Sequence, residues 1–333
     1  MNKKLVKNSD LQREHVSLSD YWYFKNNNEN QSKNNLNFFR PIIKIIKIFF
    51  EKFFNISIIK TNTINKNNYS DSEKSSLITQ KEIINRRDNL LVEKFSIFFK
   101  SLKIKANKNY LKKIIKKHDK FFFKKNSVKN NYGGISYNNS LALFIFSSIV
   151  KADHVIESGV WKGYTTSIFD KTLSKKKKFC FDINFSKLIY KSKKAKYVNY
   201  DIQKYNFESK KVFSNCLAFF DDHVSQYDRF MFCKERKIPF IVFDDDNDYF
   251  TIHRDGWPSI PTISMIRNSY KINPHFTWKS LNRSGVAKFK KINPSILNDY
   301  YYCKSPNLFN LTGYQSNSPM SFLVRKKKKT ILN

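Results

Sequence analysis

From residue 154 onward, short apolar runs alternate with amphipathic segments. The runs predict strands at HVIES (154–158), KFCFDI (178–183), KYVNY (196–200), CLAFF (216–220) and PFIVF (239–243). The segments between them predict helices at YTTSIFDKTL (164–173), FSKLIYKSKK (185–194) and SQYDRFMFCKE (225–235). This alternation is typical of an α/β fold with a doubly wound, mostly parallel sheet, and all-apolar strands indicate burial on both faces. YYYCK and MSFLVRKK predict a closing strand pair whose last strand is antiparallel, and residues 246–295 predict irregular structure.

The N-terminal part of the chain has a different texture. Residues 1–36 are polar and rich in Asn, which predicts a disordered arm. Residues 37–130 carry helical periodicity, clearest over 76–125, and predict a helical extension. Residues 131–333 then form the predicted α/β domain. Within it, SLALFIFSSIV at 140–150 predicts a buried helix that precedes the first strand.

The segment from about residue 39 to 57 predicts a helix with a narrow polar face of Arg40, Lys44 and Lys47 and with Ile and Phe elsewhere. One interpretation is a core helix. The other is a basic amphipathic helix on the anionic cytoplasmic face of a membrane, because such helices combine an apolar face with Lys and Arg. Co-sedimentation of the full chain with anionic vesicles distinguishes the two interpretations. If the protein does not pellet with the vesicles, the membrane-surface interpretation is contradicted. The chain shows no apolar run of roughly 18 residues and no signal peptide, so we expect a cytoplasmic protein, peripheral on the membrane.

Composition narrows these alternatives. The chain has 333 residues, of which 41% are hydrophobic, and this excludes a fully disordered protein. Its 62 Lys and Arg against 27 Asp and Glu give a net charge of +35, which favours anionic partners, nucleic acid included. However, only ten of the basic residues are Arg, the side chain that best matches phosphate geometry. The charge therefore keeps nucleic-acid binding as an alternative rather than as the main interpretation.

Polar residues come directly after the predicted strands, at the edge where open α/β sheets bind ligands. After the first strand come Glu157, Gly159, Trp161 and Gly163, although the whole chain holds only 7 Gly. Glycines here let the backbone approach a ligand closely, but the spacing differs from that of a dinucleotide-binding loop. After the second strand comes Asp182, whose carboxylate is suited to the two vicinal hydroxyls of a ribose.

Further acids come after the remaining strands. Asp201 and Gln203 come after the third strand and offer polar groups to an adenine edge. After the fourth and fifth strands come the sequences DDH, at 221–223, and DDDN, at 244–247. The first of these could cap the next helix and the second could be an acidic turn, but such a density of acids is unexpected in so basic a chain.

Residues 132–247 resemble the class I S-adenosylmethionine-dependent methyltransferases, above all the catechol O-methyltransferase type and related small-molecule and sugar methyltransferases. VIESGVWKGYTTSIF is similar to the first motif of that family, and FCFDIN and YDIQKY to the segments that hold ribose and adenine. FFDDHVSQYDRF and IVFDDDN resemble the motifs after its fourth and fifth strands. The resemblance implies a Rossmann-like fold that binds S-adenosylmethionine through the set Glu157, Gly159, Trp161, Gly163, Asp182, Asp201 and Gln203.

The metal-dependent branch implies in addition a Mg²⁺ site made by Asp222, Asp244 and Asp245. That branch carries a Lys base three residues after the first of these acids, whereas this chain has Ser225 there. His223 is then the nearby candidate for a general base, with Asp222 beside it.

The resemblance thus implies O-methylation of a small molecule or of a sugar of a surface glycan, in polysaccharide biosynthesis. Two alternatives remain open. One is a nucleic-acid methyltransferase or binding protein that uses the Lys-rich N-terminal helices, and it predicts a steep salt dependence of binding. The other is a membrane-associated scaffold without catalytic activity, and it predicts no affinity for the cofactor.

Overall fold

The structure, a computed structural model, describes residues 80–124, 128, 131, 134–248, 259–268, 274–279, 284–314, 316 and 318–327. The chain divides into two compact units. The first consists of residues 1–87 and 308–314, and its described part holds the beginning of α5 (Gln80–Ser101) and the short helix α11 (Phe309–Thr312). The predicted arm over 1–36 and the predicted helix over 39–57 lie outside the described residues and stay predictions.

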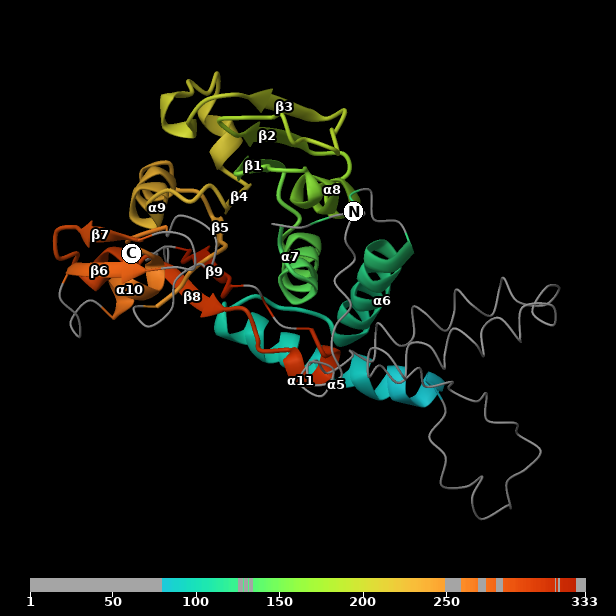
Figure 1. Ribbon diagram of the computed structural model, residues 1–333. Coiled ribbons are helices and arrows are strands. Elements are labelled where there is room, and N and C mark those ends of the chain that lie inside the picture. Colours follow the sequence, from blue (N-terminus) through green and yellow to red (C-terminus); the bar gives the residue numbers. More distant parts are fainter. Residues whose placement is uncertain are drawn as a thin grey trace, which may run out of the picture. The chain divides into compact units, whose positions relative to one another are not determined.

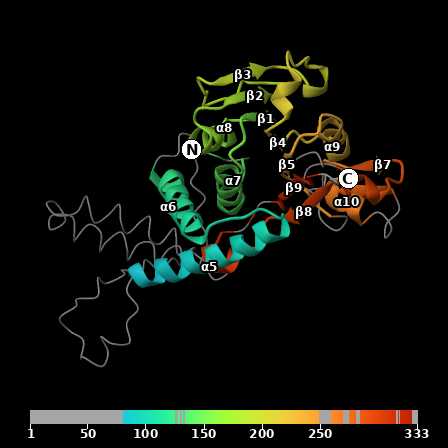
Figure 2. The ribbon, with the colours of Figure 1, turned by 180° about the vertical axis from the view of Figure 1, so that it is seen from behind.

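The second unit, residues 88–307 and 315–333, contains the sheet. In the described part of the chain, seven strands are arranged in the order β3-β2-β1-β4-β5-β9-β8. Strands β1 to β5 are parallel, and β9 runs antiparallel to both β5 and β8. Figures 1 and 2 show β3 and β8 at opposite edges. Their bounds are β1 His154–Ser158, β2 Lys177–Phe181, β3 Ala195–Val198, β4 Cys216–Phe220, β5 Phe240–Phe243, β8 Tyr300–Lys304 and β9 Ser321–Arg325. The predicted fold class and the antiparallel last strand are confirmed.

Helices cover both faces of this sheet, because successive side chains of a strand point to opposite faces. On β4, Phe219 contacts Phe169 of helix α8 (Tyr164–Thr172), with ring centres 6.1 Å apart. Its neighbours Ala218 and Phe220 belong instead to the apolar core that includes Phe230 of α9 (Gln226–Glu235). All five residues of β4 are buried, as the all-apolar run predicts.

The helices before β1 agree with the predictions. Helix α5 and α6 (Lys108–Lys124) divide the predicted helical stretch, and α7 (Tyr137–Val150) is the predicted buried helix. Ser136 caps α7, because its side chain accepts a hydrogen bond from the backbone N–H of Asn139. In the part of the chain that the structure describes, no helix combines the length and the apolar character that crossing a bilayer needs.

The helix predicted over 185–194 is wrong. Side-chain contacts hold this segment in an irregular path: the hydroxyls of Tyr190 and Ser192 donate to the two oxygens of Asp170 in α8, at 2.7 and 3.0 Å. The backbone N–H groups of Ile189 and Tyr190 both donate to the carbonyl of Lys162, so those groups are not available to a helix. Tertiary contacts thus override a helical pattern that the sequence carries.

The expectation of irregular structure over 246–295 is also wrong in part. Helix α10 (Ile263–Arg267) lies there, and so does a hairpin of β6 (His275–Lys279) with β7 (Ser284–Lys288). In the hairpin the Trp278 ring lies over Gly285, which offers room for it because it has no side chain. Only one residue of each strand is buried, so the apolar signal is weak. Among the described residues, the 3₁₀-helices are η2 Ile202–Lys204, η3 Lys210–Phe213 and η5 Pro294–Leu297.

Candidate active site

The predicted site residues after β1, β2, β4 and β5 meet at one edge of the sheet. Ser158, the last residue of β1, is in register with Phe181 of β2 and with Phe220 of β4, and Phe220 is in register with Phe243 of β5. The four strands therefore end level with one another. The loops that leave these strands lie at the carboxyl edge, where ligands bind in open α/β sheets.

The turn after β1 needs both of its glycines. Gly159 has φ of 87°, and a Cβ there would overlap the backbone carbonyl of Asp221 in the loop after β4. Gly163 has φ of 83° and precedes α8, and a Cβ there would overlap the carbonyl of Tyr190. Both positions thus combine a left-handed conformation with a close approach of another backbone segment. Packing within the chain alone explains these glycines, so their role toward a cofactor stays a prediction.

Asp182 joins the end of β2 to this turn. Its Oδ2 accepts hydrogen bonds from the backbone N–H groups of Val160 and Trp161, at 2.9 and 3.0 Å, and its Oδ1 accepts one from Asn184 at 3.0 Å. A carboxylate has about four acceptor sites, so these three bonds leave capacity for a hydroxyl. The half-buried carboxylate therefore orders the turn while one side remains suited to the predicted ribose.

Glu157 is fully buried beneath the turn. Its Oε2 accepts hydrogen bonds from Thr166 Oγ1 at 2.7 Å and Cys180 Sγ at 3.4 Å, whereas its Oε1 has no partner among the described residues. Burial raises the pKa of Glu157 to about 8. The carboxyl is therefore largely neutral at pH 7, and a cationic ligand group beside Oε1 would favour its ionised form.

Replacing Glu157 with Gln should change how stability depends on pH. The folded-state pKa, about 8, lies above the ordinary value of 4.5, so the folded protein holds this proton more tightly than the unfolded chain. This tighter binding of the proton adds to the free energy of unfolding of the wild type. The added stability is complete below pH 4.5 and is lost as pH rises toward 8, by up to about 1.4 kcal/mol per pH unit. We expect denaturant unfolding to show that the free energy of unfolding of the variant, relative to that of the wild type, increases between about pH 5 and about pH 8. If the two proteins differ in free energy of unfolding by the same amount at both pH values, burial does not raise the pKa of Glu157.

A second group of acids lies after β4 and β5. Burial and the neighbouring carboxylates of Asp244 and Asp245 raise the pKa of Asp221 well above its usual range. Burial and Asp245 likewise raise the pKa of Asp244. Asp244 is held in place by Asn139 Nδ2 of α7 and by Ser318 Oγ, each 3.1 Å from its Oδ1.

Three side chains in this group offer ligand atoms to a common point. One ligand atom each of Asp221, His223 and Asp245 lies within 4.8 Å of the other two, and His223 Nδ1 is 3.4 Å from Asp245 Oδ2. His223 and Asp245 have φ of 55° and 54°, and Trp161 has 49°. Left-handed conformations of non-glycine residues are strained and concentrate at functional sites. The structure thus groups Asp221, rather than the predicted Asp222, with His223 and Asp245.

Asp222 and Asp201 instead share the guanidinium of Arg229 in α9. Arg229 Nε donates to Asp222 Oδ2 at 2.8 Å, and its two terminal nitrogens donate to the two oxygens of Asp201 at 3.0 and 2.6 Å. Asp201 also caps η2 by accepting from the backbone N–H of Gln203. The Gln203 side chain is exposed and lines a hollow against α9, and its role toward a cofactor stays a prediction.

Sequence reasoning missed Arg229 and Asn139. Asn139 carried a signal, since YNNS opens a helix that is otherwise apolar, and buried polar side chains require partners. Arg229 carried a weaker one, as one of ten Arg in a chain whose charge comes mainly from Lys.

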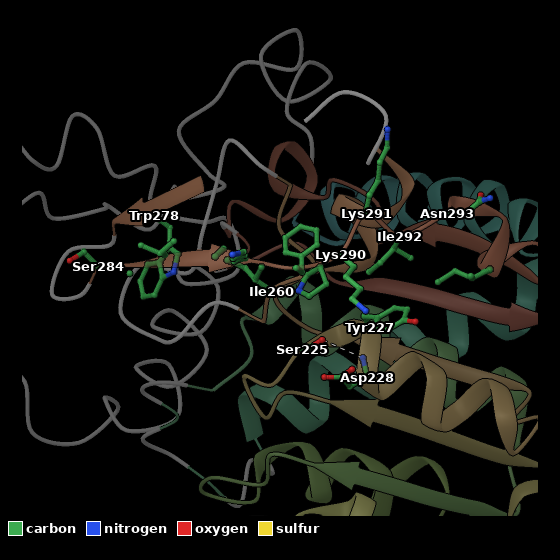
Figure 3. Close-up of a pocket in the computed structure, with 17 residues that line it drawn as sticks. Ser225, Tyr227, Asp228, Ile260, Trp278, Ser284, Lys290, Lys291, Ile292 and Asn293 are labelled. Atoms are coloured by element: carbon green, nitrogen blue, oxygen red, sulfur yellow. Dashed lines mark hydrogen bonds between the residues drawn. The ribbon is translucent and has the colours of Figure 1, made fainter. Parts of the chain in front are cut away.

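A cavity of about 990 Å³ opens beside the start of α9. Ser225, Tyr227 and Asp228 line it on the side of α9, and Trp278 and Lys290 line it from the hairpin and from the segment after it (Figure 3). Ser225, which caps α9, comes two residues after His223 in the chain. Aromatic rings together with hydroxyl, carboxylate and ammonium groups suit a polar organic molecule.

No protein-family model matches the sequence, and no curated protein matches it either. Solved structures do match. The chain is similar to the O-methyltransferase TomG from Streptomyces achromogenes, solved with SAM, at 10% identity and a TM-score of 0.36 over 70% of this chain and 96% of that one. It is also similar to an O-methyltransferase from Bacillus cereus in complex with SAH, at 10% identity and a TM-score of 0.35 over 70% and 97%.

A further match is the SAH form of cmcI-N160, with 9% identity and a TM-score of 0.28, where the chain spans 32% of its own length and 60% of the length of that protein. Because these identities and TM-scores are low, we base the fold on the strand order. Five parallel strands in the order 3-2-1-4-5, extended by an antiparallel strand inserted between β5 and β8, are the arrangement of the class I methyltransferases. In its described residues, this chain has the class I methyltransferase fold.

Proposed function

We propose that the chain is an S-adenosylmethionine-dependent methyltransferase that transfers a methyl group to an oxygen atom. The observation that carries the proposal is the carboxyl edge itself. There a glycine turn hydrogen-bonded to Asp182 adjoins the buried Glu157, and the Asp221–His223–Asp245 group lies beyond β4 and β5. One side of this edge suits a ribose and a cationic group, and the other suits a hydroxyl that must lose a proton.

In this proposal the protein mainly positions the two reactants. Asp182 would accept hydrogen bonds from the ribose, and Glu157 Oε1, unpartnered among the described residues, would be the acceptor for the methionine ammonium. Methyl transfer is an in-line displacement, for which orientation and exclusion of water provide much of the rate enhancement. In a mechanism without a bound cation, His223 takes the proton from the acceptor hydroxyl as the general base.

The acidic group also fits a divalent cation. Two carboxylates and an imidazole within 4.8 Å of one another form a plausible donor set, in which oxygen donors suit Mg²⁺ and the nitrogen suits Mn²⁺ or Zn²⁺ better. We therefore propose Asp221, His223 and Asp245 as its ligands, with Asp244 close by. A bound cation would make a nearby hydroxyl more acidic.

For the acceptor we propose a polar small molecule or a sugar, bound in the cavity beside α9. Its lining supports this, because Trp278 and Tyr227 offer aromatic surface while Ser225, Asp228 and Lys290 offer hydrogen-bonding groups. A sugar of a surface glycan is the specific acceptor that we favour. Methylation of nucleic acid remains an alternative that rests on the net charge alone.

Calorimetric titration with S-adenosylhomocysteine (SAH), with and without Mg²⁺, tests the proposed function. We expect saturable binding of one molecule per chain, and tighter or equal binding when the cation is present. If the protein is folded by circular dichroism but does not bind SAH under either condition, the proposal is contradicted. That result favours the scaffold without catalytic activity.

A further inference from the structure

Arg229 is a fully buried cation behind the carboxyl edge of the sheet. It lies in the first half of α9, and only 1% of its surface is exposed. Each of its three bonds to Asp201 and Asp222 is 3.0 Å or shorter. Hydrogen bonds between a guanidinium and carboxylates are about twice as strong as neutral ones, and the planar fork fixes their direction. One side chain therefore fixes two carboxylates that come from two different loops.

Each of the two carboxylates organises its own loop. Asp201 comes after β3 and begins η2, the segment that contains Gln203. Asp222 comes after β4, accepts a hydrogen bond from Ser158 at the end of β1 and lies between Asp221 and His223 in the chain. Arg229 thus joins the segment after β3 to the loop that presents two members of the acidic group.

The charges around Arg229 explain why a cation is needed there. Asp221, Asp222, Asp244 and Asp245 are concentrated at the ends of β4 and β5, where carboxylates of like charge repel one another. Arg229 compensates the charge of Asp222 and draws that side chain toward α9. Asp221, His223 and Asp245 are left as the group with ligand atoms close together.

We propose that Arg229 is a positioning residue that couples the 201–203 segment to the 221–223 loop. Resting on the proposed function, the inference means that cofactor bound beside the first segment fixes the loop that faces the acceptor. In this proposal the buried Arg229 acts through the two loops and not by contact with a reactant. The guanidinium fork is essential, because a Lys ammonium is a point charge that cannot hold both oxygens of Asp201 and Oδ2 of Asp222 in the same geometry.

The test compares Arg229→Lys with Arg325→Lys, the same change at the opposite edge of the sheet. Arg325 is the last residue of β9 and follows Val324, which is in register with Phe240, the first residue of β5. We expect Arg229→Lys to weaken SAH binding about tenfold, a typical magnitude for coupling between two sites, and to shift the imidazole resonances of His223 in NMR spectra. Arg325→Lys should change neither.

A purely structural role predicts a different result. In that case Arg229→Lys lowers the thermal midpoint, but the SAH affinity and the His223 resonances of the folded protein are unchanged, and the inference is overturned. Asp201→Asn, which weakens only one arm of the fork, serves if Arg229→Lys does not fold, and it should shift both quantities in the same direction. If the wild type binds no SAH, the proposed function fails, while the His223 resonances still decide whether Arg229 positions the loop.

Discussion

Replacing Asp182 with Ala should weaken SAH binding by about 1.5–3 kcal/mol, the range for hydrogen bonds to a charged group. This corresponds to a Kd about ten to 150 times higher. Two losses act together in this variant. The ribose loses its acceptor, and the turn after β1 loses the carboxylate that accepts from the N–H groups of Val160 and Trp161. Calorimetry with SAH measures the change.

Two control variants separate these causes. Asp182→Asn retains one acceptor oxygen and should have an intermediate affinity. Asp153→Ala removes an Asp at the opposite end of β1, where Lys176 pairs with it at the surface, and should leave the affinity unchanged. Equal affinity of the wild type and Asp182→Ala, with an intact fold by circular dichroism, excludes Asp182 from the cofactor site.

The strands of the sheet could be predicted because their apolar runs are unambiguous. CLAFF and FIVF are buried on both faces, and polar turns bound them, so few other structures would accommodate them. The order of the strands was not derivable from periodicity. The structure supplies it, in the registers of β1 with both β2 and β4.

The segment over 185–194 shows why local pattern fails elsewhere. Its spacing of Leu188, Ile189 and charged residues is compatible with a helix, but its conformation is determined by Asp170 and by the carbonyl of Lys162. Both partners are distant enough in the chain to lie outside the window in which periodicity is judged. The hairpin β6–β7 was not predicted for a different reason. Each of its strands buries too few residues to show an alternating apolar pattern.

The structure groups Asp221 rather than Asp222 with His223 and Asp245 for a reason of geometry. Side chains alternate along β4, so Phe219 faces α8 whereas Ala218 and Phe220 face α9. If the alternation continues, Asp222 lies on the side of α9, where Arg229 binds it, and Asp221 lies on the other side. When every residue of a strand is apolar, the sequence does not show whether the odd or the even positions face the α8 side of the sheet. The two adjacent acids therefore could not be distinguished from the sequence.

That distinction gives the most discriminating prediction for the acidic group. Mn²⁺ is the preferred probe, because an imidazole donor favours it over Mg²⁺. If Asp221, His223 and Asp245 bind the ion, Mn²⁺ at about a hundred times its Kd should stabilise the folded protein by about 2.7 kcal/mol and raise its thermal midpoint. Asp221→Asn and His223→Ala should each remove most of this rise, since each loses one of the three grouped donors.

Asp222→Asn is the matched variant, adjacent in the chain and identical in chemistry. It should lower the midpoint of the ion-free protein, because Arg229 loses a charged partner, yet keep most of the rise with Mn²⁺. His275→Ala, an exposed imidazole on β6, controls for weak binding of ions to surface histidines. If Asp222→Asn loses the rise in thermal midpoint with Mn²⁺ and Asp221→Asn keeps it, the ligand set predicted from the sequence is the correct one. If the midpoint of the wild type responds to neither Mn²⁺ nor Mg²⁺, His223 acts as a base without a metal.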